Sequence, residues 1–132
     1  DLRAPLTYSA LHLLSVDLGK VLRSCGVPNA GRIACALPNG PELAALFAAL
    51  PSSGFTLAPL NPSLQLDELV WELEDLPACA LITVMKTPKL AARRVGLPTF
   101  EWRRDERTCG LFRLMHSSAG DAHGERASTA AG

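Results

Sequence analysis

The 132-residue sequence lacks an excess of charge of either sign. Its 13 basic and 13 acidic residues cancel, which removes the positive field on which non-specific nucleic-acid binding depends. Although 48% of the residues are apolar, no apolar run approaches the ~20 residues that a membrane-spanning helix needs. These two absences predict a protein with no nucleic-acid partner and no membrane span.

The four cysteines lack the spacing of a metal site. Cys25, Cys35, Cys79 and Cys109 form no C-x-x-C pair and have no histidine at zinc-ligand spacing. Cys35 and Cys79 lie within apolar runs, where a cysteine behaves as a small hydrophobic residue. We therefore expect free, mostly buried thiols, which fit a reducing compartment better than a disulfide framework does.

The N-terminus, DLRAPLTYSA, lacks both an initiating methionine and the features of a signal peptide. We interpret the chain as an excised or incomplete piece of a longer protein. Its length corresponds to about one domain, which can bury roughly 65–70% of the surface of the unfolded chain.

Hydrophobic periodicity predicts helices and strands in alternation. Helices are expected over 7–25, 41–50, 67–76 and 88–95, and strands over 33–37, 55–61, 78–84 and 99–102. Strands that alternate with helices pair in parallel through right-handed crossovers, so we expect an α/β fold built from parallel βα repeats. Residues 1–114 should form this α/β part. The Ser-, Gly- and Ala-rich remainder, 115–132, should be a flexible linker or tail, disordered from about Ser117.

The helix after the first strand begins in RIACALPNGPELAALFAAL. Leu43, Leu46, Phe47 and Leu50 follow the i, i+3, i+4, i+7 spacing of one helical face, so we expect all four to be buried. If Phe47 covers the sheet in this way, its replacement by alanine should cost about 3–5 kcal/mol.

The turn that precedes this helix, Asn39 to Glu42, resembles a place where an anion could bind. A helix N-terminus presents free N–H groups and a positive dipole. However, the turn has neither G-x-G-x-x-G nor G-x-x-x-x-G-K-[ST], and Pro41 removes one N–H donor. Glu42 also places a negative charge where the anion would lie. We interpret the turn as the capped start of a packing helix.

Other residues that could carry chemistry have no partner at a useful spacing. They are His12, Lys20 (after Gly19), Glu72, Glu74, Asp75, His116, His123 and the pairs Arg93-Arg94 and Arg103-Arg104. The carboxylates and arginine pairs are typical of solvated faces, and His116 and His123 fall in the expected tail. We therefore expect no catalytic, cofactor-binding or metal-binding residue in this chain.

Three segments together resemble the start of AMP-forming acyl-CoA synthetases of the adenylate-forming superfamily. They are LTYSALHLLSVDLGKVLRSCGV, RIACALPNGPELAALFAAL and APLNPSLQLDELVWELEDLPACALIT. The resemblance covers about Leu6 to Thr83 and extends more weakly, through GLFRL, to Leu114. Within the superfamily, the segments LPNGPE and PLNPSLQLDEL are most similar to the oxalate-CoA ligase-like branch. The sequence departs from the family's pattern in two places, at PSSG (residues 51–54) and at Pro77. Both fall at helix ends, where proline is tolerated.

For a complete enzyme the resemblance implies two steps: a small carboxylic acid attacks the α-phosphate of Mg-ATP to give an acyl-adenylate and pyrophosphate, and the CoA thiol then displaces AMP to give the thioester. The family's phosphate loop, of the type TSGTTGxPKG, and its C-terminal lysine match no position here. ATP, Mg and CoA are therefore implied only for the complete enzyme, in which the partner of this part is the rest of the domain. The implied location is cytoplasmic, or peroxisomal if a C-terminal signal follows. The alternative is a degenerate, stand-alone α/β module that binds a protein or small ligand without catalysis.

Overall fold

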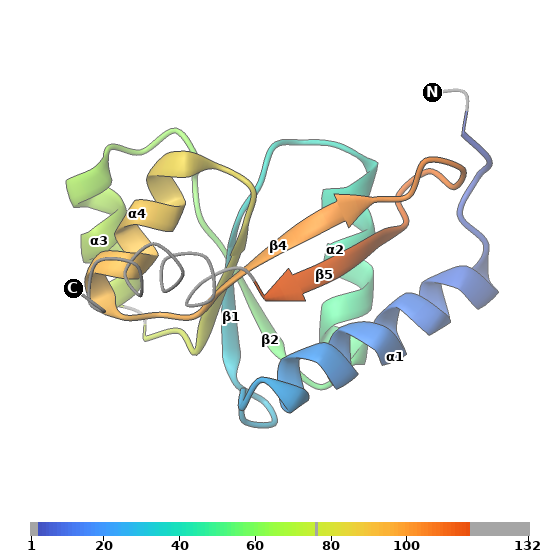
Figure 1. Ribbon diagram of the computed structural model, residues 1–132, viewed down its shortest axis with the longest axis horizontal. Coiled ribbons are helices and arrows are strands. Elements are labelled where there is room, and N and C mark those ends of the chain that lie inside the picture. Colours follow the sequence, from blue (N-terminus) through green and yellow to red (C-terminus); the bar gives the residue numbers. More distant parts are fainter. Residues whose placement is uncertain (1–2, 76, 117–132) are drawn as a thin grey trace, which may run out of the picture.

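A computed structural model describes residues 3–75 and 77–116 of the chain. Helices and strands alternate through most of this part (Figure 1). The helices are α1 (Tyr8–Ser24), α2 (Pro41–Ser52), α3 (Leu66–Asp75) and α4 (Lys86–Val95). The strands are β1 (Arg32–Ala36), β2 (Thr56–Pro59), β3 (Ala80–Thr83), β4 (Thr99–Arg104) and β5 (Phe112–His116).

The strands form one sheet in the order β2-β1-β3-β4-β5. The first four are parallel, with Ile33 of β1 opposite Leu57 of β2 and Ala80 of β3, whereas β5 runs antiparallel to β4. Helices α1 and α2 cover one face of the sheet, and α3 and α4 cover the other (Figure 1). The expected α/β class with parallel βα repeats is confirmed.

The sheet separates two hydrophobic cores. The larger joins α1 and α2 to the sheet and to the buried side chains of β4 and β5, and the smaller joins α3 and α4 to the opposite face. All four residues of β3 are buried, as is usual for a parallel strand with helices on both sides. None of the helices in the described residues is long and apolar enough to cross a membrane.

The first helix begins and ends as its sequence predicts. The Thr7 hydroxyl oxygen accepts a hydrogen bond from the backbone N–H of Ala10 at 3.1 Å and so caps α1. After Cys25, Gly26 takes a φ of 90°, a left-handed conformation that glycine adopts without strain. The inward stripe of α1 includes Leu14, Leu18 and Leu22, which are buried.

The expectation that Phe47 is buried is wrong, because 45% of this residue is exposed. The face that α2 turns inward consists instead of Glu42, Ala45, Leu46, Ala49 and Leu50. The small side chains of the two alanines allow this face of α2 to lie close to its neighbours. Phe47 projects from a different side of the helix, toward solvent.

The sequence does not predict β5, because the hydrophobic periodicity fades after Trp102 in a charged segment. Within β5, Phe112 and Leu114 are buried and Arg113 and Met115 are exposed, which is the alternation of a half-buried strand. His116, assigned from the sequence to the tail, ends this strand, and its ring centroid lies 4.9 Å from that of Phe100. The expected disorder from Ser117 onward falls outside the described residues.

Candidate functional site

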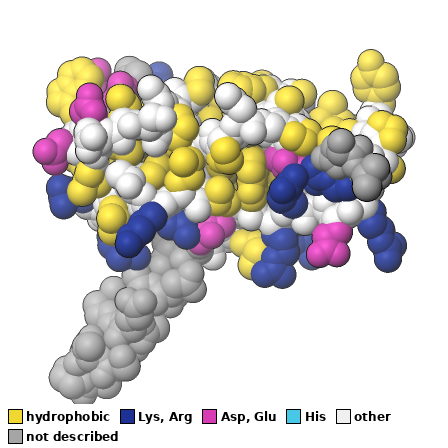
Figure 2. All heavy atoms as spheres, turned by 90° about the horizontal axis from the view of Figure 1, so that it is seen from above, with side chains coloured by type: hydrophobic (Ala, Val, Ile, Leu, Met, Phe, Trp, Pro, Cys, Tyr) yellow, Lys and Arg dark blue, Asp and Glu magenta, His cyan; other side chains and the backbone are white. Residues whose placement is uncertain are grey.

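The carboxyl edge of the parallel strands is the natural place to search for a site. From β1 the chain crosses to β2 on one side, and from β3 to β4 on the other, so the direction of winding changes between β1 and β3. In open α/β sheets, ligands bind outside the strand ends at such a point. Figure 2 looks onto this edge, where hydrophobic side chains cover much of the surface and charged side chains flank them.

Thr83, the last residue of β3, has a polar side chain that is already hydrogen-bonded. The hydroxyl of Thr83 donates to the backbone oxygen of Ala36 at 2.6 Å and accepts from the backbone N–H of Met85 at 3.1 Å. Thr83 is fully buried, so these bonds fasten the end of β3 to the end of β1. In residues 3–75 and 77–116, no buried side-chain nitrogen or oxygen lacks a hydrogen-bond partner.

The start of α2 is occupied by the carboxylate of Glu42. Gly40 is the N-cap, Pro41 holds the first helical position, and Glu42 follows with only 3% of its surface exposed. Its Oε2 accepts a hydrogen bond from Nη1 of Arg3 at 2.8 Å and lies 3.6 Å from Nε of Arg104. A ligand anion at this helix end would meet a carboxylate that two arginines already neutralise.

These neighbours set the protonation state of Glu42. Burial alone would raise the pKa of its carboxyl group. Hydrogen bonds from Arg3 and from its own backbone N–H, with the positive charges of Arg104 and Arg3, outweigh burial and lower that pKa below its ordinary value of 4.5. Glu42 is therefore ionised at neutral pH, which favours the interpretation of this turn as a capped helix start.

The partner of Glu42 could not be read from the sequence, because Arg3 lies 39 residues away. The structure holds Arg3 in place through the segment that follows it. The Ala4 N–H donates to the Arg107 oxygen at 2.8 Å, and the Cys109 N–H donates to the Ala4 oxygen at 2.7 Å. No spacing or composition signal predicts this contact between the N-terminal segment and the turn from β4 to β5.

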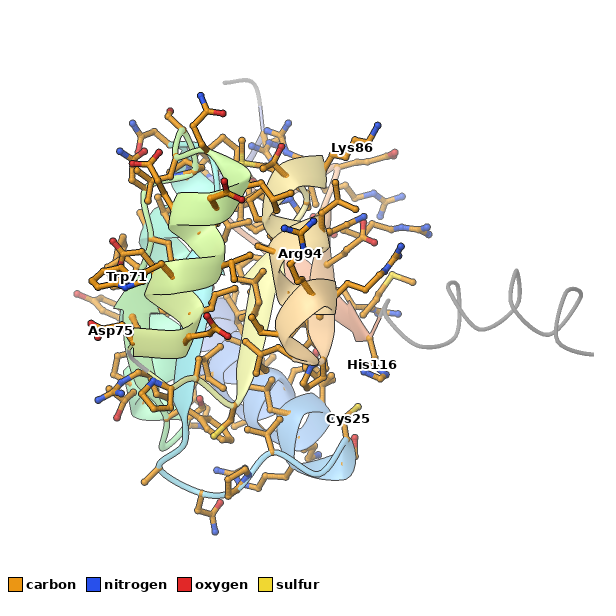
Figure 3. All side chains as sticks on the ribbon, turned by 90° about the vertical axis from the view of Figure 1, so that its left-hand side faces the viewer. Cys25, Trp71, Asp75, Lys86, Arg94 and His116 are labelled. Atoms are coloured by element: carbon orange, nitrogen blue, oxygen red, sulfur yellow. The ribbon has the colours of Figure 1, made fainter. Side chains whose placement is uncertain are left out.

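The histidine, carboxylate and α4 arginine candidates lie on separate surfaces of the fold. His12 and Lys20 are exposed on α1, Glu74 and Asp75 are exposed on α3, and Arg94 extends from α4 (Figure 3). Arg94 Nη1 lies 3.9 Å from Oδ1 of Asp67. Both side chains are exposed, and exposed ion pairs of this kind contribute little to the stability of the fold. Within the described part of the chain, no three His, Cys, Asp or Glu residues are arranged to hold a metal ion.

The cysteines differ sharply in accessibility. Cys35 is buried in β1, and burial raises the pKa of its thiol to about 11, whereas Cys25 is exposed just after α1 (Figure 3). None of the four cysteines forms a disulfide in the described residues, and Cys79 and Cys109 are half-buried. Because the thiolate is the reactive form, a maleimide should label Cys25 rapidly and Cys35 only after unfolding. Mass spectrometry of timed digests measures this order, and rapid labelling of Cys35 in the native protein would contradict it.

The arrangement of strands and helices is that of the adenylate-forming enzymes. MatB from Rhodopseudomonas palustris aligns with 75% of this chain and 22% of its own, with a TM-score of 0.63 and 21% identity. VinN, solved with L-aspartate, aligns with 74% of this chain and 27% of its own, with a TM-score of 0.62 and 27% identity. The model of the AMP-binding enzyme family matches residues 2–121, and the chain belongs to this family.

A curated relative agrees with this assignment. The 2-succinylbenzoate–CoA ligase of Bacillus mycoides (strain KBAB4) is 28% identical over 103 residues, which are 66% of this chain and 21% of the relative. The chain thus spans about a fifth of the length of the curated relative it matches. The resemblance to AMP-forming acyl-CoA synthetases of the adenylate-forming superfamily is confirmed, whereas the oxalate-CoA ligase-like branch stays a prediction.

Proposed function

We propose that this chain is the N-terminal part of an AMP-dependent acyl-CoA synthetase and contributes structure rather than catalytic groups. The observation that carries the proposal is the family match over residues 2–121 of a chain that covers only 21% of its ligase relative. In the complete enzyme, this part would supply strands to the large domain's sheet and pack against the rest of that domain. The division at residue 114 and the cytoplasmic location remain predictions.

The proposal assigns ATP, Mg and CoA to the complete enzyme rather than to this part of it. MatB has also been solved with ATP bound, but the helix start that could attract a phosphate here holds the Glu42 carboxylate, ion-paired with Arg3. The sequence has no match to the family's phosphate loop. We therefore assign ATP-dependent carboxylate activation, and the thioester formation that follows, to the complete enzyme. A small carboxylic acid, of which 2-succinylbenzoate is the example given by a relative, is its proposed substrate class.

The purified 132-residue chain is expected to catalyse no exchange of labelled pyrophosphate into ATP with 2-succinylbenzoate or other small carboxylates. The physical reason is that nothing in it matches the groups that the family uses to hold the triphosphate. A complete 2-succinylbenzoate–CoA ligase serves as the positive control. Exchange above a no-protein blank would refute the scaffold role, and binding of a carboxylate without exchange would favour a stand-alone binding module.

A further inference from the structure

The two edges of the sheet are built differently. At one edge lies β2, four residues long and ending at the exposed Pro59, and proline is a common device for protecting an edge. At the other edge lies β5, which contains no proline. Among the described residues, β5 has a neighbouring strand on one side only, which is β4. The outer side of β5 is thus the less protected edge of this sheet.

The hydrogen-bond register identifies the backbone groups at that outer edge. The last pair of the β4–β5 ladder is Arg104 with Phe112, so the next residues, Asp105 and Leu111, also lie opposite each other. The Asp105 N–H donates a hydrogen bond to the Leu111 oxygen at 2.9 Å. In an antiparallel pair, residues that bond across to the partner alternate with residues whose N–H and C=O point away from it. Phe112 and Leu114, at the alternate positions, therefore direct their backbone N–H and C=O groups away from β4.

A groove of about 630 Å³ lies between α1 and the β4–β5 hairpin. Its apolar lining includes Leu13, Val16 and Met115, which are 66%, 41% and 44% exposed. Such a lining suits the alternate side chains of a strand added beside β5, because an added strand gains affinity from backbone bonds and from pockets for every second side chain.

The groove is also basic. Arg103 and Arg113 line it and lie directly opposite each other in the β4–β5 ladder, where like charges destabilise a sheet. Both are exposed, and no ion pair is formed by either one within residues 3–75 and 77–116. Lys20 and Arg104 add two further positive charges to the lining, against the carboxylates of Asp17 and Asp105, although Arg104 also lies 3.6 Å from the carboxylate of Glu42. A second copy of the chain at this edge would place its own basic groove beside this one, and the two would repel each other. An acidic segment would instead neutralise the arginines of the groove.

We propose that the outer edge of β5 receives an extended segment in which apolar and acidic residues alternate, and that the rest of the AMP-binding domain supplies this segment. The assignment of the source rests on the proposed function. The added strand would pair with the N–H and C=O groups of Phe112 and Leu114, place apolar side chains against Leu13 and Val16, and place carboxylates beside Arg103 and Arg113.

The test uses the full 132-residue chain and a short blocked peptide of alternating glutamate and valine. Hydrogen exchange of the isotope-labelled protein is followed by NMR with and without the peptide. We expect saturating peptide to slow exchange of the Phe112 and Leu114 amides about tenfold or more. The amides of Arg113 and Met115, which face β4, should change much less. The matching lysine–valine peptide should produce no such protection.

Charge reversal then tests the basic groove. The double variant R103E/R113E keeps like charges opposite each other, so its stability should stay close to that of the parent. It should lose about tenfold or more in affinity for the glutamate peptide and should bind the lysine peptide instead. The control R93E/R94E changes the net charge equally at exposed positions of α4 and should bind as the parent does.

Unchanged exchange at Phe112 and Leu114 would overturn the proposal, as would equal binding of the two peptides. Protection that rises with protein concentration alone would mean that a second copy occupies the edge, which also overturns it. None of these readouts involves nucleotide chemistry. Pyrophosphate exchange by the chain would therefore refute the proposed function without altering the result on strand addition.

Discussion

Replacement of Leu46 by alanine is expected to lower the free energy of unfolding by about 2–5 kcal/mol. Leu46 belongs to α2 and is fully buried in the larger core, so the change removes apolar contacts and leaves a cavity. Urea denaturation followed by circular dichroism measures the loss as a lower midpoint at an unchanged slope.

The adjacent Phe47 provides the matched control. It lies in the same helix but is 45% exposed, so Phe47→Ala should cost about 1 kcal/mol or less, although it removes the larger side chain. A loss at Phe47 equal to or greater than the loss at Leu46 would mean that α2 is rotated relative to the arrangement described above.

Replacement of Glu42 by glutamine is expected to lower the free energy of unfolding by about 1–3 kcal/mol near neutral pH. The amide keeps the shape of the carboxyl group but loses the charge that holds Arg3 at 2.8 Å. Arg3 has only 11% of its side chain exposed, so water compensates its guanidinium poorly once the carboxylate is gone.

The effect should depend on pH in a definite direction. Because folding lowers the pKa of Glu42, its ionised form stabilises the native state above the unfolded value of about 4.5. That contribution is lost as the pH falls through the still lower pKa of the folded protein. The difference in stability between the parent and Glu42→Gln should therefore be constant near neutral pH and shrink in acid. A difference that grew on acidification would contradict this assignment.

Glu101→Gln is the control for that experiment. Glu101 pairs with Lys89 at 2.7 Å, but its side chain is 32% exposed and that of Lys89 is 34% exposed. Solvent screens such a pair, so its loss should cost about 1 kcal/mol or less. Equal losses for the two glutamates would mean that burial of the Arg3–Glu42 pair adds nothing to its strength.

The sequence was sufficient for the elements whose signals are local. The threonine cap of α1, the proline at the first position of α2 and the left-handed Gly96 after α4 each depend on residues within one turn. The sequence was insufficient where contacts from distant residues decide. Phe47 fits the helical stripe as well as Leu46 does, and only the rotation of α2 against its neighbours distinguishes them.

The same limit explains the results for the candidate site and for β5. Pro41 and Glu42 predict a helix start at this turn because their effect on it is local, and α2 does begin at Pro41. The arginines that hold Glu42 come from the N-terminal segment and from β4, which no sequence period connects. The strand β5 alternates over too few residues, in too charged a context, for its pattern to be recognised without β4 beside it.

The bridge between Ala4 and Thr108 closes nearly the whole described chain into a single loop. In chain statistics the entropic cost of closure rises only with the logarithm of loop length, by about 0.6 kcal/mol for each doubling. The entropy lost when the N-terminal segment binds to the β4–β5 turn is therefore only slightly larger than the entropy lost on closing a loop of half this length. Two backbone hydrogen bonds of Ala4 and the ion pair of Arg3 fasten the segment to the fold, although none of these contacts belongs to the hydrophobic cores.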